Sequence, residues 1–458
     1  MGSYGSIKNK IILRNRYKQM AKSFNMTNLK KTYYYLKRNG VMPTIGAALE
    51  RVQAPYFADY KYELPSSSIL EEQKTTSWQK PILFSVVVPA YETKEEFLKV
   101  VIDSLLDQTY PHWELIIADA SSTDKVKVEC EKYPDTRIRY VKLQNNAGIS
   151  ENTNEGIKEA KGDYIGLLDH DDYLTPDALY EMAMAMKNGK EEGKEYGFLY
   201  SDEDKCDETG TVFYDPHIKT DFNLDLFLTN NYICHFCVMK ADLMKKLAFR
   251  KEYDGAQDYD ICLRAVAELW KENPKVEETI CHIPRVLYHW RCHNDSTAAN
   301  PQSKRYAYDA GKRALQDFVN KKGWKATVEE MPHVGFYKVV YQGGVLAQRE
   351  DVAAVGYKQL KNGKVVSGIY DKEGNQLYEG LPFCYSGYIH RAVLAQNASY
   401  MDIHTWTLHP KVQYEVEIFW KELSSNKKMT EEEVRKAVCD YLTDKGYRLF
   451  WNPVGKMR

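Results

Sequence analysis

The sequence predicts an α/β fold in which a mixed, mostly parallel sheet is flanked by helices. Apolar, β-branched runs alternate with amphipathic segments from residue 82 to residue 168, and this alternation is typical of right-handed parallel βαβ units. The fourth apolar run, Tyr164 to Leu168, leads directly into the acidic stretch Asp169-His170-Asp171-Asp172. Because open α/β sheets bind ligands at the carboxyl ends of their strands, we expect a ligand site at this stretch.

The predicted elements follow one another in chain order. Residues 82–89 form a continuous apolar run closed by a proline, as expected of a buried parallel strand. Residues 95–108 place Phe97, Val101 and Leu105 on one stripe, which predicts an amphipathic helix. Further strands are predicted at 113–118, 138–143 and 164–168, with helices at 150–160 and 259–267.

The acidic stretch has two interpretations. Asp169 and Asp171 form an Asp-X-Asp pattern, whose hard oxygen atoms suit Mg²⁺ or Mn²⁺. Such ions usually share their coordination shell with substrate phosphates. Alternatively, the stretch is a solvated acidic turn that caps a helix beginning at Thr175. The stretch by itself leaves both interpretations open.

The composition is that of an ordinary globular protein, with 43% hydrophobic and 28% charged residues. Its length of 458 residues suffices for about three average domains. The net charge of −1 argues against a polyanion partner, so we expect no nucleic-acid binding. No apolar stretch approaches the roughly 18 residues needed to span a bilayer, and no signal-peptide core is present. Nine cysteines without disulfide-scaffold spacing predict a cytoplasmic protein.

Residues 1–80 are predicted to be a helical, basic segment followed by a linker. Between Asn28 and Asn39, basic residues flank three consecutive tyrosines. Such a helix can make a peripheral contact with the anionic inner face of a membrane. The alternative is a helix packed on the main domain with its lysines in water. Residues 65–81, rich in Ser, Thr, Glu and Gln, are predicted as the linker.

The chain lacks the two common glycine-rich phosphate motifs. No Gly-X-Gly-X-X-Gly follows the first strand and no Gly-X-X-X-X-Gly-Lys-Ser/Thr is present, which argues against a nicotinamide oxidoreductase. Instead, Asp119 and Asp169 stand at strand ends, where a carboxylate can accept a hydrogen bond from a ribose or a base. Asp119 is alternatively a plain turn residue. With a metal at Asp171 to hold a diphosphate, the pattern favours a nucleotide-diphosphate site without a glycine loop.

An ordered series of motifs over roughly residues 82 to 300 resembles family 2 of the glycosyltransferases, which have the GT-A fold. One such motif arises easily by chance, but an ordered series does not. The motifs are most similar to those of bacterial enzymes that build cell-surface polysaccharides, including rhamnan and O-antigen transferases. The stretches that carry the resemblance are 86–92, Asp119, 145–150 with Asn154, 168–172, 200–205, 231–235, 255–260, 288–293 and 296–297.

The resemblance implies an inverting sugar transfer with a single general base. Asp258 matches the acidic residue that serves as the base in this family, and Asp260 is the competing candidate. The family usually has Glu before the base, whereas this chain has Gln257. One base and no second carboxylate for a covalent intermediate imply inversion at the anomeric carbon.

The resemblance also implies a Mn²⁺ or Mg²⁺ cofactor held by Asp169, Asp171 and His293, with His289 as an alternative to His293. The implied donor-binding residues, which include a loop that closes over the diphosphate, are Pro89, Tyr91, Glu92, Asp119, Asn146, Gly148, Asp169, Arg291 and Ser296.

Two other clusters have metal-like spacing. Cys234 and Cys237 form a Cys-X-X-Cys pair, but no second such pair exists, which argues against a structural zinc. Residues 202–204, Asp-Glu-Asp, could hold a metal. Because they match a Ser-Asp-Glu-Asp-Lys motif of the family, we expect them to order the acceptor-side floor instead.

The chain is predicted to have three parts: a helical segment and linker at 1–80, assigned from composition, and, as the resemblance implies, a GT-A domain at 81–334 and an α+β half-domain at 335–458. The last part resembles a degenerate second domain without the Asp-X-Asp or base motifs, so it is expected to pack, to form a homo-oligomer or to bind saccharide. The expected function is a metal-dependent, inverting transfer of a sugar from a UDP- or dTDP-linked donor to a lipid-linked saccharide acceptor, during assembly of a bacterial surface polysaccharide. The alternative is a non-catalytic member that binds nucleotide or partner enzymes.

Overall fold

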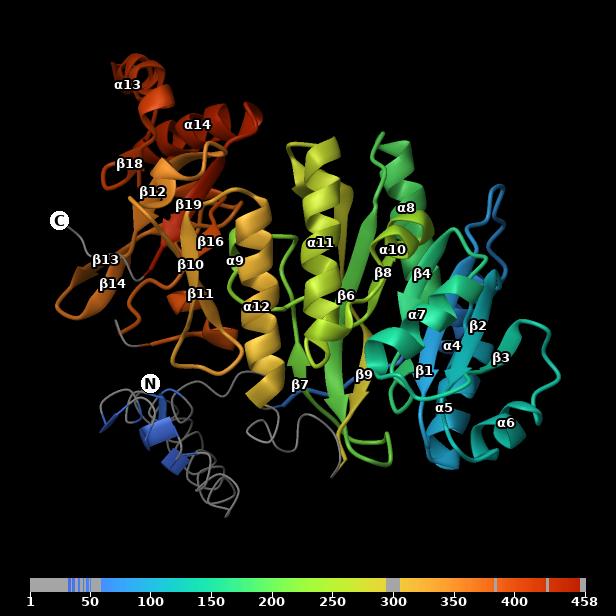
Figure 1. The fold of residues 1–458 in the computed structure, drawn as a ribbon. Helices are drawn as coiled ribbons and strands as arrows, with labels where there is room; N and C mark the ends of the chain where they lie inside the picture. Colours follow the sequence, from blue (N-terminus) through green and yellow to red (C-terminus); the bar gives the residue numbers. More distant parts are fainter. Residues whose placement is uncertain are drawn as a thin grey trace, which may run out of the picture. The chain divides into compact units, whose positions relative to one another are not determined.

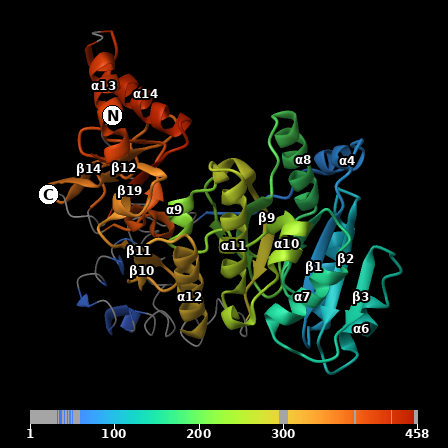
Figure 2. The ribbon, with the colours of Figure 1, turned by 45° about the horizontal axis from the view of Figure 1, so that its top comes forward.

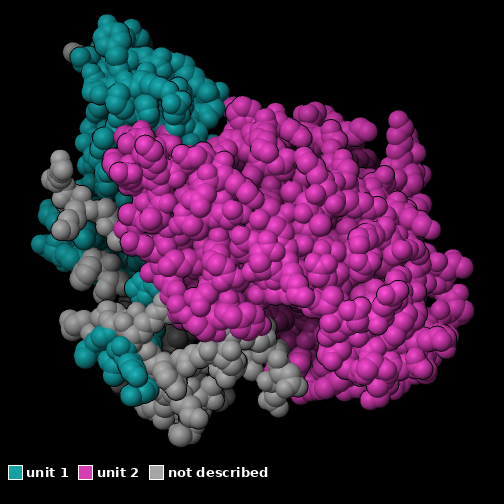
Figure 3. Space-filling view, viewed as in Figure 1, with its two compact units in different colours: residues 1–58, 331–333, 350–458 teal, residues 59–330, 334–349 magenta. Residues whose placement is uncertain are grey.

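The structure, a computed structural model, describes residues 59–293, 305–382, 385–425 and 428–453, together with isolated positions between 32 and 50. The chain forms two compact units, which Figure 3 colours separately. Unit 2 comprises Asp59–Glu330 and Val334–Arg349, and unit 1 comprises Met1–Ala58, Met331–His333 and Glu350–Arg458. Among the described helices, none is long and apolar enough to cross a membrane.

Among the described residues of unit 2, nine strands form one mixed sheet: β1 (Phe84–Ala90), β2 (Trp113–Asp119), β3 (Ile138–Lys142), β4 (Tyr164–Leu167), β5 (Tyr173–Leu174), β6 (Phe198–Cys206), β7 (Phe213–His217), β8 (Cys237–Lys240) and β9 (Ile280–Arg291). The strand order is β3-β2-β1-β4-β8-β6-β9-β5, with β7 paired to β6. β3, β2, β1 and β4 are parallel, as predicted from the alternating apolar runs. β8 runs antiparallel to β4 and β6, and β9 runs parallel to β6.

Helices cover both faces of this sheet, as Figure 1 and Figure 2 show. α5 (Glu95–Leu106), α6 (Lys125–Cys130) and α8 (Ala178–Glu191) share one core cluster with Val86 and Val88 of β1. α7 (Ile149–Glu159), α10 (Ala241–Leu247) and α11 (Gln257–Glu272) cover the opposite face. There Gly156 allows close contact, because a Cβ on it would lie 2.7 Å from Val87 Cγ1. The predicted α/β fold class is confirmed.

The parallel strands place their following residues at one edge of the sheet. Ala90 at the end of β1 lies opposite Asp119 at the end of β2. The backbone N–H of Leu168, just after β4, donates to the carbonyl of Val87 at 3.2 Å. The acidic stretch that follows β4 therefore lies at the same edge as Asp119, which is the arrangement expected of strands with a common direction.

The predicted linker at 65–81 is wrong in its central part. Residues Ser67–Lys74 form α4, with the Ser66 hydroxyl accepting from the backbone N–H of Ile69. Gln73 is buried and accepts a hydrogen bond from Thr109 Oγ1 at 2.8 Å. The polar composition suggested a linker because most of this short helix faces water.

The N-terminal segment is described at only a few positions. Tyr33, Tyr35, Leu36 and Lys37 are helical. The other residues on which the membrane-contact prediction rests lie outside the described residues, so that prediction stays a prediction.

The rest of unit 2 packs beside α11. A helix, α12 (Arg305–Lys321), contacts α11 and a hairpin of β10 (Ala326–Glu330) and β11 (Tyr337–Tyr341). Four short elements complete the unit: α9 (Leu224–Phe227), η1 (Lys251–Tyr253), η2 (Val276–Thr279) and η3 (Val345–Ala347).

Unit 1 is an α+β unit with a four-stranded sheet in the order β16-β19-β12-β18. β12 (Val352–Tyr357) pairs in parallel with β19 (Arg448–Asn452). Val438 and Leu442 of α14 (Glu431–Asp444) belong to the same core cluster as Trp451. The remaining elements are β13 (Gln359–Lys361), β14 (Lys364–Ser367), β15 (Ile369–Tyr370), η4 (Tyr388–Val393), β16 (Gln396–Asn397), β17 (Tyr400–Met401), β18 (Thr407–Leu408), α13 (Pro410–Ser425) and α14 (Glu431–Asp444).

Lys358 is a buried cation in unit 1. Its side chain follows β12, and its Nζ donates to the carbonyl of Ala392 at 2.5 Å and lies 5.7 Å from the centre of the Trp451 ring. Burial lowers the pKa of Lys358 to about 8, because the charged form loses its hydration. Since the unfolded chain restores that hydration, the charge of Lys358 destabilises the folded unit.

We expect Lys358→Met to raise the melting temperature of unit 1 at pH 7. The lysine pKa is lower in the folded state than in the unfolded state, so its penalty, about 1 to 3 kcal/mol, is full below pH 8 and fades as the pH rises toward the unfolded value. Differential scanning calorimetry at pH 7 and about pH 9.5 measures the difference. Lys361→Met, at an exposed lysine nearby, is the control, and an unchanged or lower melting temperature for Lys358→Met would contradict the expectation.

Candidate active site

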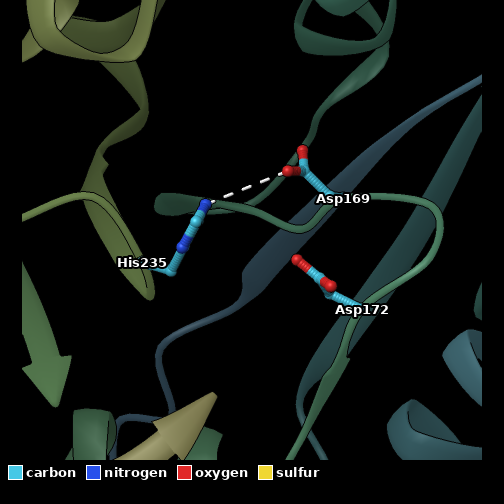
Figure 4. Close-up of side chains that lie close together, drawn as sticks. All are labelled: Asp169, Asp172 and His235. Atoms are coloured by element: carbon cyan, nitrogen blue, oxygen red, sulfur yellow. Dashed lines mark ion pairs between the residues drawn. The ribbon is translucent and has the colours of Figure 1, made fainter. Parts of the chain in front are cut away.

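Three side chains converge at the carboxyl edge of the sheet. Asp169, Asp172 and His235 each offer one ligand atom, and these atoms lie within 4.8 Å of one another. Figure 4 shows the three side chains close together, with a dashed line between His235 and Asp169. His235 Nε2 lies 3.9 Å from Asp169 Oδ2. Asp169 is exposed, His235 is half-buried and Asp172 is buried. The cluster therefore has one open side.

Asp172 is held in place by two donors. The hydroxyl of Tyr288 donates to its Oδ2 at 2.6 Å, and the backbone N–H of Arg291 donates to its Oδ1 at 2.7 Å. Burial and the neighbouring carboxylates of Asp171 and Asp169 nevertheless raise the pKa of Asp172 well above its usual range. Carboxylates that crowd in this way favour a nearby cation.

His235 links this cluster to a buried carboxylate beneath it. Its Nδ1 lies 3.1 Å from Glu203 Oε2, and its ring stacks on Tyr288 at 4.6 Å between centres. A proton on Nδ1 that donates to Glu203 leaves the Nε2 lone pair on the side of Asp169. Carboxylate–histidine pairs of this kind orient metal-binding imidazoles. Burial tends to raise the pKa of Glu203, but Lys219 and His235 beside it lower it well below its usual range.

The predicted ligands Asp171 and His293 form a separate pair. His293 Nε2 lies 2.8 Å from Asp171 Oδ2. The Nδ1 atom of His293 is buried and has no hydrogen-bond partner in the described part of the chain. Asp169 is thus accompanied by Asp172 and His235 rather than by the two ligands predicted with it.

Arg291 is almost fully buried at the end of β9, where it is 2% exposed. Its Nε donates to the backbone carbonyl of Asp171 and its Nη1 to that of Glu208, both at 2.7 Å. Its Nη2 is buried and makes no hydrogen bond within the described residues. A guanidinium with unused donors beside an acidic cluster can bind an anionic oxygen.

Two other residues near Arg291 in the sequence were predicted to belong to the site: Ser296 and His289. Ser296, predicted in the loop that closes over the diphosphate, lies outside the described residues. His289, the alternative metal ligand, is buried, and its Nδ1 lies 2.6 Å from Asp204 Oδ1. Rings of Tyr62, Tyr173 and Phe213 surround His289, so its role in this structure is packing.

Asp119 and Glu92 accept hydrogen bonds that link the ends of neighbouring strands. Asp119 is fully buried, and its carboxylate accepts from Tyr140 Oη at 2.8 Å, Lys142 Nζ at 3.1 Å and a backbone N–H. Glu92 has a left-handed φ of 48°, and its Oε1 accepts from the backbone N–H and hydroxyl of Ser122 at 2.8 Å. Both carboxylates stabilise the loops around the edge, so their donor-binding roles stay predictions.

The other predicted donor residues lie near the carboxyl ends of β1 and β3 or follow them. Pro89 is buried within β1, and Tyr91 just after it is 51% exposed. Asn146 is exposed, and its Oδ1 accepts from Asn152 Nδ2 at 2.8 Å. Gly148 has a φ of +104°, and a Cβ there would lie 2.9 Å from an Asp254 oxygen, so only glycine fits this position.

The two candidate bases stand in the first turn of α11 in different surroundings. Asp260 is 1% exposed, and Arg250 and Arg264 both donate to its carboxylate, Arg264 Nε at 2.9 Å. A buried carboxylate between two guanidinium groups is a structural ion pair and is poorly suited to accept a proton.

Asp258 is half-buried and has neutral partners. Its Oδ2 accepts from Asn231 Nδ2 at 2.7 Å and from Cys234 Sγ at 3.4 Å. No ion pair joins Asp258 to a cation within the residues that the structure describes. Its environment suits a carboxylate that takes up a proton better than that of Asp260 does.

The acidic motif at 202–204 lies in β6, and its three carboxylates are buried. Asp202 lies 2.9 Å from His282 Nε2, Glu203 contacts His235, and Asp204 contacts His289. Each carboxylate thus has an imidazole partner. The described residues show no additional metal cluster at this motif.

Three of the site residues were not predicted from the sequence: Asp172, His235 and Asn231. Asp172 belongs to the acidic stretch itself, whereas His235 and Asn231 lie in the segment before β8. Their position within the series of family motifs was the available signal. The contact of His235 with Asp169 depends on the antiparallel pairing of β8 with β4, which brings the segment before β8 to the end of β4.

Residues 85–248 match the profile of glycosyl transferase family 2. The uncharacterized protein y4gI of Sinorhizobium fredii is 41% identical over 239 residues, covering 51% of this chain and 25% of that protein. O-antigen biosynthesis protein RfbC of Myxococcus xanthus is 29% identical over 294 residues, covering 62% and 22%. WcaA of Escherichia coli, named as a glycosyl transferase of colanic acid biosynthesis, is 32% identical over 210 residues, covering 44% and 72%. The match thus spans about a quarter of the length of the first two relatives.

We expect Asp260→Asn to destabilise unit 2 far more than Asp258→Asn does. Removing the Asp260 charge leaves two guanidinium groups short of a counter-charge, at a cost on the order of 3 kcal/mol. Asp258→Asn should change the free energy of unfolding by less than about 1 kcal/mol. Urea unfolding followed by tryptophan fluorescence measures both variants. Equal losses would show that the two carboxylates have the same structural role.

Proposed function

The chain belongs to glycosyl transferase family 2, and from this membership we propose that it is an enzyme that moves a sugar from a nucleotide-diphosphate donor to a saccharide acceptor. The observation that carries the proposal is the cluster of Asp169, Asp172 and His235. The segment 231–235 connects this cluster to the half-buried Asp258. Two relatives named for O-antigen and colanic acid biosynthesis support a role in bacterial surface polysaccharide assembly.

The proposed donor carries UDP or dTDP, and the proposed acceptor is a saccharide linked to a lipid. A lipid-linked acceptor would place the reaction at the inner face of the membrane. The basic, tyrosine-rich sequence between Asn28 and Asn39 supports this setting, because such sequences bind anionic lipid surfaces.

The residues present fit a divalent cation. Asp169 and Asp172 offer carboxylate oxygens and His235 offers an imidazole nitrogen, a donor set that suits Mn²⁺ better than Mg²⁺. Asp171 and His293 stand beside this set as a second candidate pair. When bound, the cation would stabilise the charge that develops on the departing diphosphate.

Arg291 supplies the second positive charge. Two contacts, made by Nε and Nη1, fix the guanidinium, while Nη2 retains its donors. We infer that Nη2 donates to a phosphate oxygen of the donor. Because the side chain is already ordered by its neighbours, little reorganisation is needed when the diphosphate becomes more negative.

Asp258 is the proposed general base. Asn231 and Cys234 both bond to its Oδ2, which leaves Oδ1 to accept the proton of the acceptor hydroxyl. The deprotonated oxygen then attacks the anomeric carbon from the face opposite the diphosphate, and the carbon–oxygen bond to the diphosphate breaks. A single displacement of this kind inverts the anomeric configuration.

Asp258→Asn should lower sugar transfer by about 10²- to 10⁴-fold, because general base catalysis contributes this much. Turnover of UDP- and dTDP-sugars with saccharide acceptors, followed by release of the nucleoside diphosphate, measures the effect. Binding of UDP with Mn²⁺ should remain. Full activity in Asp258→Asn would remove the assigned role, and a wild-type protein that binds nucleotide without any turnover would favour a non-catalytic member.

Mn²⁺ with UDP should raise the melting temperature of the wild-type protein, whereas NAD should not. We expect Asp169→Asn and Asp172→Asn to abolish the Mn²⁺-dependent part of the shift, because each removes one proposed ligand. Asp171→Asn should reduce it less. If only Asp171→Asn abolished the shift, the cation would bind with His293 and Asp171 instead.

A further inference from the structure

One loop touches both halves of the proposed site. Asn231 Nδ2 donates to Asp258 Oδ2 at 2.7 Å, and Cys234 Sγ approaches the same oxygen at 3.4 Å. At the other end of the loop, His235 Nε2 faces Asp169 Oδ2 at 3.9 Å. The loop also bonds to itself, since the backbone N–H of Cys234 donates to Asn231 Oδ1 at 3.4 Å. The loop therefore contacts both the proposed base and the proposed cation site.

A buried ammonium group holds this loop in place. The side chain of Lys219 is 0% exposed. Its Nζ donates to the backbone carbonyls of Ile233 and His235 and lies 3.3 Å from Glu203 Oε2. All three protons of the ammonium group are thus used.

Glu203 is the second residue that holds His235 in place. The same Oε2 atom accepts from the backbone N–H of His235 at 3.2 Å and lies 3.1 Å from its Nδ1. His217 Nδ1 contacts the other oxygen at 3.2 Å. Lys219 and Glu203 therefore fix both the backbone and the ring of His235.

We propose that the 231–235 loop, anchored by Lys219, is a positioning element for the transfer reaction, with Asn231 positioning Asp258 and Lys219 positioning His235. The inference rests on the proposed function. Neither Asn231 nor Lys219 touches the reacting atoms in this scheme; each acts through a residue that does.

The size of the expected effect follows from geometry. Reacting groups must be held in near-attack positions, and a misplacement of about 1 Å can cost roughly 100-fold in rate. Residues that orient metal ligands typically change metal affinity by about 10- to 100-fold when they are removed. A lysine that served only the stability of the fold would lower the melting temperature without changing either quantity.

The test compares Asn231→Ala and Lys219→Met with the full-length wild-type chain, well below each melting temperature. Three quantities are measured: kcat, KM for the donor, and the dissociation constant of Mn²⁺ from the loss of its free-ion electron paramagnetic resonance signal. Asn231→Ala should lower kcat by about 10- to 100-fold and leave donor KM and Mn²⁺ affinity within about twofold of wild type. Lys219→Met should lower kcat and also weaken Mn²⁺ binding by about 10- to 100-fold.

Lys240→Met is the matched control, because Lys240 ends the strand that follows the loop and pairs with the exposed Glu195. It should leave all three quantities unchanged. An Asn231→Ala protein with wild-type kcat, or a folded Lys219→Met protein with wild-type kcat and Mn²⁺ affinity, would overturn the proposal. If Lys219→Met fails to fold, Asn231→Ala decides. If the wild-type protein transfers no sugar, the proposed function fails, and the Mn²⁺ measurement on Lys219→Met still decides the inference.

Discussion

Carboxylates that leave water need an opposite charge or several donors, and this requirement governs the centre of unit 2. The buried carboxylates of β6 are matched by imidazoles and by the ammonium group of Lys219. Asp260 is matched by two guanidinium groups. The acidic stretch after β4 is different, because its carboxylates stand close together with fewer cations. These carboxylates therefore crowd one another at the sheet edge, where burial and the crowding raise the pKa of Asp172.

The sheet explains how three successive carboxylates can all be satisfied. Side chains alternate between faces along a strand, so Asp202 and Asp204 turn toward histidines of β9 while Glu203 turns toward the loop before β8. β6 lies between β8 and β9 and has shifts in register at this motif. The antiparallel strand β8 lies beside β4, and the segment that precedes β8 places His235 at the acidic edge. The parallel strands alone could not provide a histidine there.

The parallel half of the sheet could be predicted because its strands are apolar on both faces and its helices have clear stripes. Residues 82–89, 113–118 and 164–168 were predicted within a few residues of β1, β2 and β4. α4 was missed because its few buried contacts, such as that of Gln73, leave a polar composition. In the site, Asp169 and Asp258 were predicted from motifs. The proximity of His235 to Asp169 instead arises from strand pairing between segments that lie 66 residues apart in the chain. Spacing along the chain carries no information about such a contact.

The strand order of unit 1 has a consequence for biosynthesis. β19, formed by Arg448–Asn452, lies between β12 and β16 and supplies the middle of the four-stranded sheet. During translation β12 and β16 leave the ribosome well before β19. Until β19 follows, β16 lacks its partner in this sheet and β12 has only its short antiparallel pairing with β18. Unit 2, in contrast, has all its strands by Arg349. The nascent chain therefore passes through a stage with one finished unit and one set of open strand edges, at which a chaperone would have most to protect.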